Sequence, residues 1–263
     1  MCTVDLNCDM EIQVAGAFRR FRWGRADELG TAAFWVDQTR RDPIWSQDQR
    51  LGANLAEEVG ACLLGGFGTP ADICIAAFGR LRDAGIFAKA HSADQADIEC
   101  LLAQPLAVSG RARPVRYRFW KQRAGRLAAC LIQVDAFEQL VDARGLRDAL
   151  LGLPGVGPKT ASWIARNHLG SDELAVIDVH IRRAGVAAGF FDPGWRLPAD
   201  YSLFEEAFVS VAALGQVRTS ALDACIWGVL SWLGKAGSVI IERDPGKGQA
   251  PSPPAVLAAA TAE

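Results

Sequence analysis

Residues 153–162 read LPGVGPKTAS, and the run behind them keeps helical character as far as Gly170. A glycine-rich turn that opens a helix offers backbone N–H groups to a phosphate. The residues in front, LRDALLGL, favour a helix rather than a strand. The stretch therefore predicts two helices joined by a tight glycine hairpin, with Lys159 in the first turn of the second helix.

Two familiar phosphate-binding loops do not fit this hairpin. A P-loop places its lysine directly after a glycine, and here Pro158 separates Gly157 from Lys159. The dinucleotide fingerprint needs a third glycine where this chain has Thr160, and it needs a strand in front. What remains is a helix, a hairpin turn and a helix.

Length and composition indicate a protein with one large core or with two lobes that share a cleft. The chain has 263 residues, half of them apolar. No apolar run reaches the roughly 18 residues of a membrane helix. The N-terminus, MCTVDLNCDMEIQ, carries acids where a signal peptide carries a basic flank. We therefore expect a soluble, cytoplasmic protein with no membrane partner.

The cysteines do not form a metal or disulfide pattern. None of the seven belongs to a C-x-x-C pair, and only three histidines are present. We therefore expect no disulfide, zinc site or iron–sulfur cluster. Four cysteines lie in apolar helical context, where a free thiol packs as a small hydrophobic group; these are Cys62, Cys74, Cys130 and Cys225.

The charge distribution matters more than the net charge. The net charge of −2 argues against a nucleic-acid partner, but residues 111–126 hold seven Arg or Lys and no acid, and RRFRWGR spans 19–25. Local basic patches govern phosphate binding. A solvated helix face balanced by nearby acids is the alternative; the interleaved Tyr117, Phe119 and Trp120 favour nucleic acid.

Helix signals dominate the rest of the chain. Capping patterns predict helices that open at Ser46, at Asp135 and, through Ser202-x-x-Glu205, at Ser202. Further helices start at Thr69-Pro70 and at Thr219 or Ser220. Sustained alternation is almost absent, apart from a short extended stretch around AVSGRARPVRYRF. Residues 1–243 are thus expected to form one mostly helical unit, and the Pro/Ala/Gly-rich residues 244–263 a disordered tail.

A second segment, ELAVIDVHIRRAG, bears on the chemistry of Lys159. Asp178 ends an apolar run at a helix start, where N-cap aspartates are common for structural reasons alone. The positive end of a helix dipole disfavours an ammonium group, and a neutral amine is a nucleophile. If both helix starts face one cleft, the carboxylate can stabilise a cation such as the one that develops at C1′ when a nucleobase leaves deoxyribose.

LPGVGPKTA followed by AVIDVH resembles the signature of the helix-hairpin-helix base-excision DNA glycosylases, in particular the 8-oxoguanine glycosylase/AP lyase group. The resemblance covers residues 146–185, with the hairpin motif at about 146–170, and weaker similarity extends to VRYRFWKQRA and LDACIW. It implies an all-α, two-lobed fold with the active site in the cleft between the lobes. It also implies a monomer that binds duplex DNA containing a damaged base.

The resemblance also implies roles for individual residues. Lys159 matches the nucleophile that displaces the base and forms a Schiff base, after which β-elimination nicks the strand. Asp178 matches the aspartate that stabilises the oxocarbenium-like state. The phosphate cradle corresponds to the amides of Gly155, Val156 and Gly157, with a monovalent cation often bound to the hairpin carbonyls. His180 matches a phosphate-contacting histidine.

Two departures from related groups favour the 8-oxoguanine branch. Endonuclease III and adenine glycosylase relatives commonly carry a four-cysteine cluster after the last helix, whereas this chain has only Cys225 in its final third. Adenine glycosylases lack the lysine. Signals for the extra N-terminal β-sheet domain of animal-type enzymes are missing, which favours the compact prokaryotic subfamily.

The residues that read the base are predicted less directly. A base must leave the duplex to be reached, so a wedge and a pocket are needed. Tyr117 and Arg118 resemble a wedge and an orphan-base contact. Asp223 and Trp227 are similar in spacing to a pair of residues that reads the base in archaeal members. For Trp227, burial in the protein core is an equally good interpretation. Trp163, four residues after Lys159, could line the pocket.

Three functions stay open on the sequence alone. The first is a bifunctional glycosylase/lyase for 8-oxoguanine, which needs no cofactor. The second is a glycosylase of the same mechanism for another modified base. The third is a non-catalytic module that uses its hairpin only to bind DNA phosphates, and which has no need of a carboxylate near Lys159.

Overall fold

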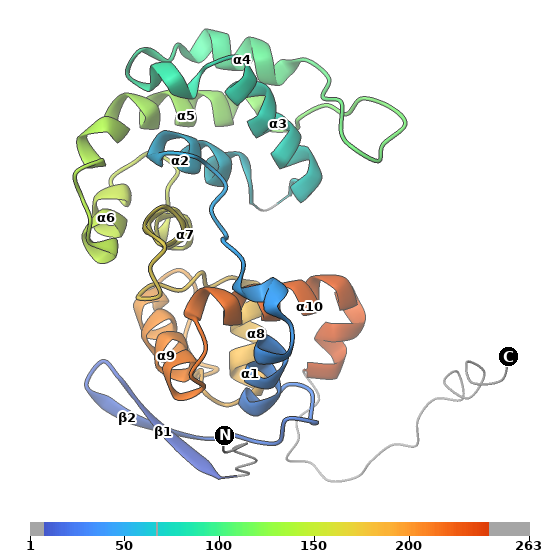
Figure 1. Ribbon diagram of the computed structural model, residues 1–263, viewed down its shortest axis with the longest axis vertical. Helices are drawn as coiled ribbons and strands as arrows, with labels where there is room; N and C mark the ends of the chain where they lie inside the picture. The colour runs from blue at the N-terminus through green and yellow to red at the C-terminus, as the bar shows by residue number, and fades with distance from the viewer. Residues whose placement is uncertain (1–7, 67, 242–263) are drawn as a thin grey trace, which may run out of the picture.

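The computed structural model describes residues 8–66 and 68–241, with side chains described as far as residue 234; the predicted tail lies outside these residues. Helices make up most of the described chain (Figure 1). The α-helices are α1 (Ala32–Arg41), α2 (Leu55–Leu64), α3 (Ala71–Asp83), α4 (Gln95–Ala103), α5 (Trp120–Val134), α6 (Ala143–Leu150), α7 (Pro158–Leu169), α8 (Val179–Ala187), α9 (Tyr201–Leu214) and α10 (Thr219–Ile241). Short 3-10 turns are η1 (Pro43–Ser46), η2 (Phe87–Ser92) and η3 (Asp135–Phe137).

The buried apolar residues form two separate cores, so the predicted two-lobed helical fold is confirmed. The core of the upper lobe (residues 55–174) runs from Leu55 to Leu174 along the chain. The core of the lower lobe (residues 8–46 and 175–241) combines both ends of the chain. The boundary falls between two consecutive residues, Leu174 and Ala175. In Figure 1, α7 lies between the lobes.

The helix-hairpin-helix is confirmed as α6, a turn and α7. Asp142 caps α6 by accepting a hydrogen bond from Gly145 N at 2.6 Å. Pro158 occupies the first turn of α7, where its missing N–H costs nothing. Gly170 ends the helix in the left-handed conformation, with φ 63°. These local signals are all readable in the sequence, which is why the prediction was accurate here.

Three predicted helix starts are displaced. Ser46 belongs to the 3-10 turn η1, and α2 instead begins after Asn54, whose side chain accepts from Glu57 N. Asp135 opens only η3, and the exposed Val141 leads into α6. Helix α9 begins at Tyr201, one residue before Ser202. Capping patterns recur in loops, because the same side chains stabilise turns.

A β-hairpin at the N-terminus was not predicted. Strands β1 (Asp9–Val14) and β2 (Ala17–Arg22) pair antiparallel, with Met10 opposite Phe21. Both turn residues have positive φ, 49° at Ala15 and 79° at Gly16, as tight hairpin turns require. Ile12 and Val14 are buried in the lower core. The signal was weak because alanine is an unusual residue at a positive-φ turn position.

None of the helices in the described part of the chain is both long enough and apolar enough to span a bilayer.

Candidate active site

The hairpin turn is held from inside the upper lobe. Leu153 and Val156 are buried, and Val156 N donates to Leu153 O at 3.1 Å. Gly155 has a φ of 82°, and a Cβ there would lie 2.5 Å from Cδ of Arg126. Only glycine fits this position, because both the backbone angle and the arginine stem exclude a side chain.

The amides around the turn decide what it can bind. In the described part of the chain, the N–H groups of Gly155, Gly157 and Lys159 donate to no protein acceptor. Free amides at a helix N-terminus favour an anion such as phosphate. The amide of Val156 closes the turn onto Leu153, so Gly155 and Gly157 are the two predicted cradle residues whose amides have no protein acceptor, and phosphate binding by the cradle stays a prediction.

The predicted cation at the hairpin carbonyls stays a prediction. The carbonyl oxygens of Leu153 and Gly157 each accept one backbone hydrogen bond, from Val156 and Ala161 respectively. Each oxygen therefore keeps a lone pair that fits a monovalent ion.

Lys159 lies in the first turn of α7 and is half-buried. Its Nζ is 5.6 Å from the ring centroid of Trp163, one turn further along. Trp163 packs near Gly65 at the end of α2. The prediction that Trp163 shares the face of Lys159 is confirmed, while its role in a base pocket stays a prediction. The amine of Lys159 thus lies beside an aromatic ring at the N-terminus of α7.

Asp178 is the N-cap of α8, as predicted. Its Oδ1 accepts from His180 N at 2.8 Å and from Ile181 N at 3.0 Å, and the side chain is half-buried. His180 thus has its amide bound to the cap, and its half-buried side chain forms no hydrogen bond within the described residues. The phosphate contact proposed for His180 stays a prediction.

Asp223 does not lie open to a base. It is 6% exposed, forms an ion pair with Arg166 of α7, and accepts from Val176 N at 3.2 Å. The prediction of a free base-reading carboxylate is therefore corrected: in this structure Asp223 joins α10 to α7 and to the segment that leads to Asp178. Burial raises the pKa of this carboxyl to about 6, against the opposing effect of Arg166.

This pKa predicts a pH dependence of stability. The folded-state pKa of Asp223 lies above its ordinary value of 3.8, so its contribution is fully present below that value and is lost as pH rises through about 6. From pH 7 to pH 5, the free energy of unfolding of the wild type should rise by about 1 kcal/mol relative to Asp223→Asn. Chemical denaturation at both pH values measures the difference.

Asp72 provides a control of opposite sign. A hydrogen bond from Arg111 lowers the pKa of its carboxyl. Its stabilising contribution is lost only as pH falls through a pKa below 3.8, so the difference in the free energy of unfolding between the wild type and Asp72→Asn should not change between pH 7 and pH 5. An equal pH response of the Asp72 and Asp223 variants would contradict the assignment.

Tyr117 is not a wedge in this structure. The ring is 1% exposed in the upper core, and its hydroxyl donates to Leu64 O at 2.6 Å. Burial raises the pKa of this hydroxyl. A wedge must reach the DNA, so this prediction is corrected. The neighbouring Arg118 is exposed, with its guanidinium 5.2 Å from the ring centroid of Phe119; its orphan-base contact stays a prediction.

Trp227 lies at the surface, and the alternative of a core position is wrong. Its side chain is 48% exposed on α10, one turn after the buried Asp223. The two residues share a helix spacing but differ in burial, so they do not form one open pair. Trp227 remains available to stack on a base.

The two basic stretches differ. In residues 19–25, Arg19 binds Asp192 and the carbonyl of Phe190 within the lower lobe, and Arg25 pairs with Asp27 at the surface, so acids balance both of these charges. In residues 111–126, Arg111 pairs with Asp72, but Arg118 and Arg126 form no ion pair within the described residues. The second stretch therefore keeps positive charge for an anionic partner.

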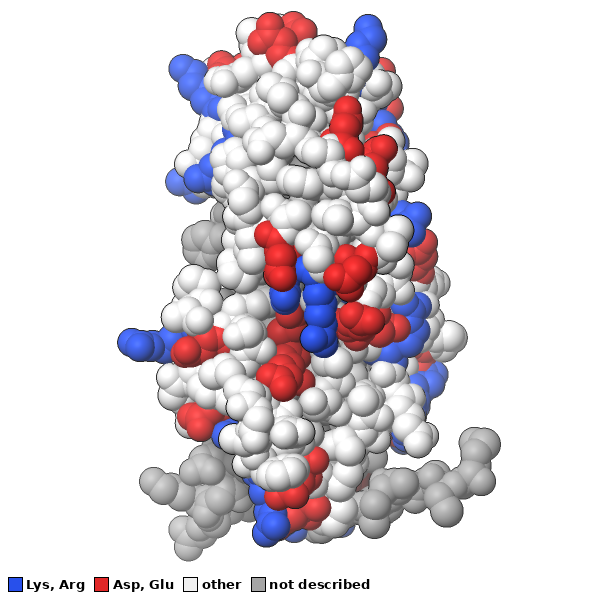
Figure 2. Space-filling model, turned by 90° about the vertical axis from the view of Figure 1, so that its left-hand side faces the viewer, with Lys and Arg blue, Asp and Glu red and all other residues white. Residues whose placement is uncertain are grey.

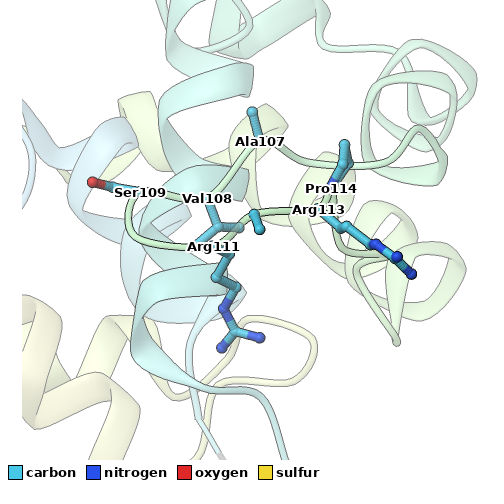
Figure 3. A pocket seen from close by; sticks show the side chains of 7 residues that line it. Ala107, Val108, Ser109, Arg111, Arg113 and Pro114 are labelled. Carbon is cyan, nitrogen blue, oxygen red and sulfur yellow. The ribbon is translucent and has the colours of Figure 1, made fainter.

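Two hollows lie away from Lys159. One, of about 390 Å³, is formed by a single loop, residues 107–114, and Figure 3 shows the side chains of Arg111 and Arg113 extending from this loop. The other, of about 200 Å³, lies at the lobe boundary and is lined by Arg50, Arg166 and Arg218 among others. These three guanidinium groups are engaged by α7 carbonyls, Asp223 and Asp172 respectively. Neither hollow contains Lys159 or Asp178.

The packing predicted for the cysteines is confirmed, since Cys62, Cys74, Cys130 and Cys225 are buried thiols. No group of three or more potential metal ligands occurs among the described residues.

Sequence reasoning missed the buried polar residues that connect the lobes. Glu205 was expected only as part of a capping pattern, and neither Ser162 nor Arg166 was singled out. All three are buried, and they join α7 to the lower lobe. In the sequence, each of these residues is only a polar residue on an otherwise apolar helix face. That pattern does not indicate which distant group forms its hydrogen bond or ion pair.

Comparisons with known proteins identify the fold. No protein-family model and no curated protein sequence matches this chain. Solved structures do. The 8-oxoguanine DNA glycosylase of Thermotoga maritima matches with a TM-score of 0.58 and 20% identity, over 76% of this chain and 97% of that one. The Methanocaldococcus jannaschii 8-oxoguanine glycosylase/lyase, in complex with DNA containing 8-oxoguanine, matches with a TM-score of 0.53 and 19% identity. The match covers 76% of this chain and 90% of that one.

A trapped endonuclease III–DNA covalent intermediate also matches, with a TM-score of 0.52 and 17% identity over 74% of this chain and 82% of that one. The fold is therefore that of the helix-hairpin-helix DNA glycosylases, as the resemblance over residues 146–185 implied.

Proposed function

We propose that this chain is a DNA glycosylase, and more specifically a bifunctional glycosylase/AP lyase that excises 8-oxoguanine from duplex DNA. The observation that carries the proposal is the position of Lys159. It follows a hairpin with free amides, lies at a helix N-terminus, and belongs to a helix that Asp223 joins to the segment before Asp178. The likeness in fold to 8-oxoguanine glycosylases supports the choice of substrate.

In the proposed reaction, Nζ of Lys159 attacks C1′ of the damaged nucleotide. A bond forms between Nζ and C1′ as the bond from C1′ to the base breaks, and the base leaves with the electron pair and takes up a proton. The carboxylate of Asp178 stabilises the positive charge that develops on the sugar. The bond from C1′ to O4′ then breaks, O4′ takes the electron pair and a proton, and Nζ forms the double bond of a Schiff base to C1′. Loss of a C2′ proton to water then expels the 3′ phosphate, which nicks the strand.

The free amides of Gly155 and Gly157 bind a DNA phosphate in this proposal and hold the sugar near Lys159. The damaged base must leave the stack to be reached. Trp163 and Trp227 offer partly exposed rings for stacking, and Arg118 offers an exposed guanidinium for the base left behind.

Borohydride trapping on a panel of duplexes tests the proposal. Each duplex carries one modified base, and the panel includes 8-oxoguanine, other oxidised bases and an undamaged control. We expect a covalent adduct and a nicked strand with 8-oxoguanine and neither with undamaged DNA. An adduct on a different lesion would assign the same mechanism to another base. Binding with no adduct on any duplex would favour a non-catalytic hairpin module.

A further inference from the structure

Glu205 connects three parts of the chain through one buried carboxylate. The residue lies on α9 in the lower lobe and is 6% exposed. Its Oε1 accepts from Ser162 Oγ at 2.7 Å and from Ala175 N at 3.2 Å, and its Oε2 accepts from Arg147 Nη1 at 2.6 Å. One side chain thus joins α6, α7 and the segment between α7 and α8.

The partners of Glu205 flank both residues of the proposed reacting pair. Ser162 lies three residues after Lys159 on α7, a spacing that places the two on neighbouring faces of the helix. Ala175 lies three residues before Asp178. The carboxylate therefore fixes the helix that carries the nucleophile and the backbone that leads to the acid.

Tyr201, one turn earlier on α9, holds the same backbone. Its hydroxyl donates to Ala175 O at 2.8 Å and accepts from Ile177 N at 3.1 Å. Ile177 directly precedes Asp178. Together the two α9 side chains bind both backbone polar groups of Ala175 and the amide of Ile177. These bonds restrict the backbone directly before Asp178.

These contacts cross the boundary between the lobes. Arg147 and Ser162 belong to the upper lobe, and Glu205 belongs to the lower lobe. On the face seen in Figure 2, acidic and basic side chains intermix near the middle of the molecule. Charged hydrogen bonds of this kind are short and directional, so they fix geometry as well as adding attraction.

We propose that Glu205 is a positioning residue, which sets the distance and orientation of Lys159 relative to Asp178 by binding Ser162 and Ala175 at once. The inference rests on the proposed function. A displacement of about 1 Å between reacting groups can cost roughly 10²-fold in rate, so a single buried carboxylate that ties both segments has a large effect on the chemistry and a small effect on DNA binding.

Ser162→Ala and Glu205→Gln test the proposal in the full-length protein. The first removes only the bond to α7, and the second keeps the shape of the side chain but removes the charge that Arg147 requires. Thr39→Val is the matched control, because Thr39 is also buried and its hydroxyl donates a hydrogen bond to Trp35 O at 2.8 Å, within α1.

The excision rate, the Kd for DNA and the amide hydrogen exchange together separate positioning from a general structural role. We expect single-turnover excision at saturating enzyme to fall about tenfold or more in both site variants, with the Kd for a duplex carrying a tetrahydrofuran abasic analogue within about threefold of wild type. Amide hydrogen exchange at residues 175–178 should be faster in both variants. Thr39→Val should change none of these quantities.

An active wild type whose excision rate is unchanged in Ser162→Ala and Glu205→Gln would overturn the positioning role alone. Equal losses in rate and in DNA affinity would also overturn it, because they would indicate a general loss of structure. A wild type without excision on any duplex would instead overturn the proposed function, and the positioning role with it.

Discussion

Lys159→Ala should abolish the borohydride-trapped DNA adduct and reduce base excision by roughly 10³-fold or more, because the variant lacks the amine that forms the covalent bond. The substitution should leave the fold intact. Lys159 is half-buried in the first turn of α7 and forms no ion pair within the described residues, so the free energy of unfolding should change by less than about 1 kcal/mol. Gel analysis of trapped adducts and denaturant unfolding measure the two effects.

Lys89→Ala is the matched control for this experiment. Lys89 is an exposed lysine in η2 that lies outside both the hairpin and the two basic stretches. We expect wild-type amounts of adduct from it. A Lys159→Ala protein that still formed the adduct would show that another amine is the nucleophile.

Asp178→Asn should reduce excision by about 10²–10³-fold while leaving the protein equally stable. The variant loses the negative charge that stabilises the sugar cation. It keeps an oxygen for the amides of His180 and Ile181, and asparagine caps a helix as well as aspartate does. Single-turnover kinetics and thermal unfolding together separate the charge from the cap.

Asp142→Asn provides the same change at a helix without a proposed catalytic role. Asp142 caps α6 through Gly145 N, and its substitution should alter neither excision nor stability. Asp178→Ala should in addition lose about 1 kcal/mol of stability with the cap. If Asp178→Asn excised the base at the wild-type rate, the carboxylate would have a structural role only.

The parts of the site that the sequence predicts are those built from neighbouring residues. The hairpin and the first turn of α7 depend on Gly155 and Pro158, each of which has a conformational preference of its own. The N-cap at Asp178 is likewise a local feature. Such signals need no knowledge of the rest of the molecule, so Lys159 and Asp178 could be placed at helix starts from the sequence alone.

The parts that the sequence does not predict depend on partners far along the chain. Glu205 was expected to cap a helix, but it binds Ser162, which lies 43 positions away. Tyr117 was expected to act as a wedge in DNA, yet its hydroxyl donates a hydrogen bond inside the core to a carbonyl 53 positions away. A polar or aromatic residue gives no indication of which distant group satisfies it, so its burial is decided only by tertiary packing.

The division of the two cores along the chain has a consequence for biosynthesis. All core residues of the upper lobe have left the ribosome soon after Leu174 is added, whereas the lower lobe needs α1 and β1 from one end and α9 and α10 from the other. Contacts between β1 and α9 or between α1 and α10 close loops of most of the nascent chain, which slows their formation. The half of the molecule that carries Lys159 therefore has its core complete before the half that carries Asp178.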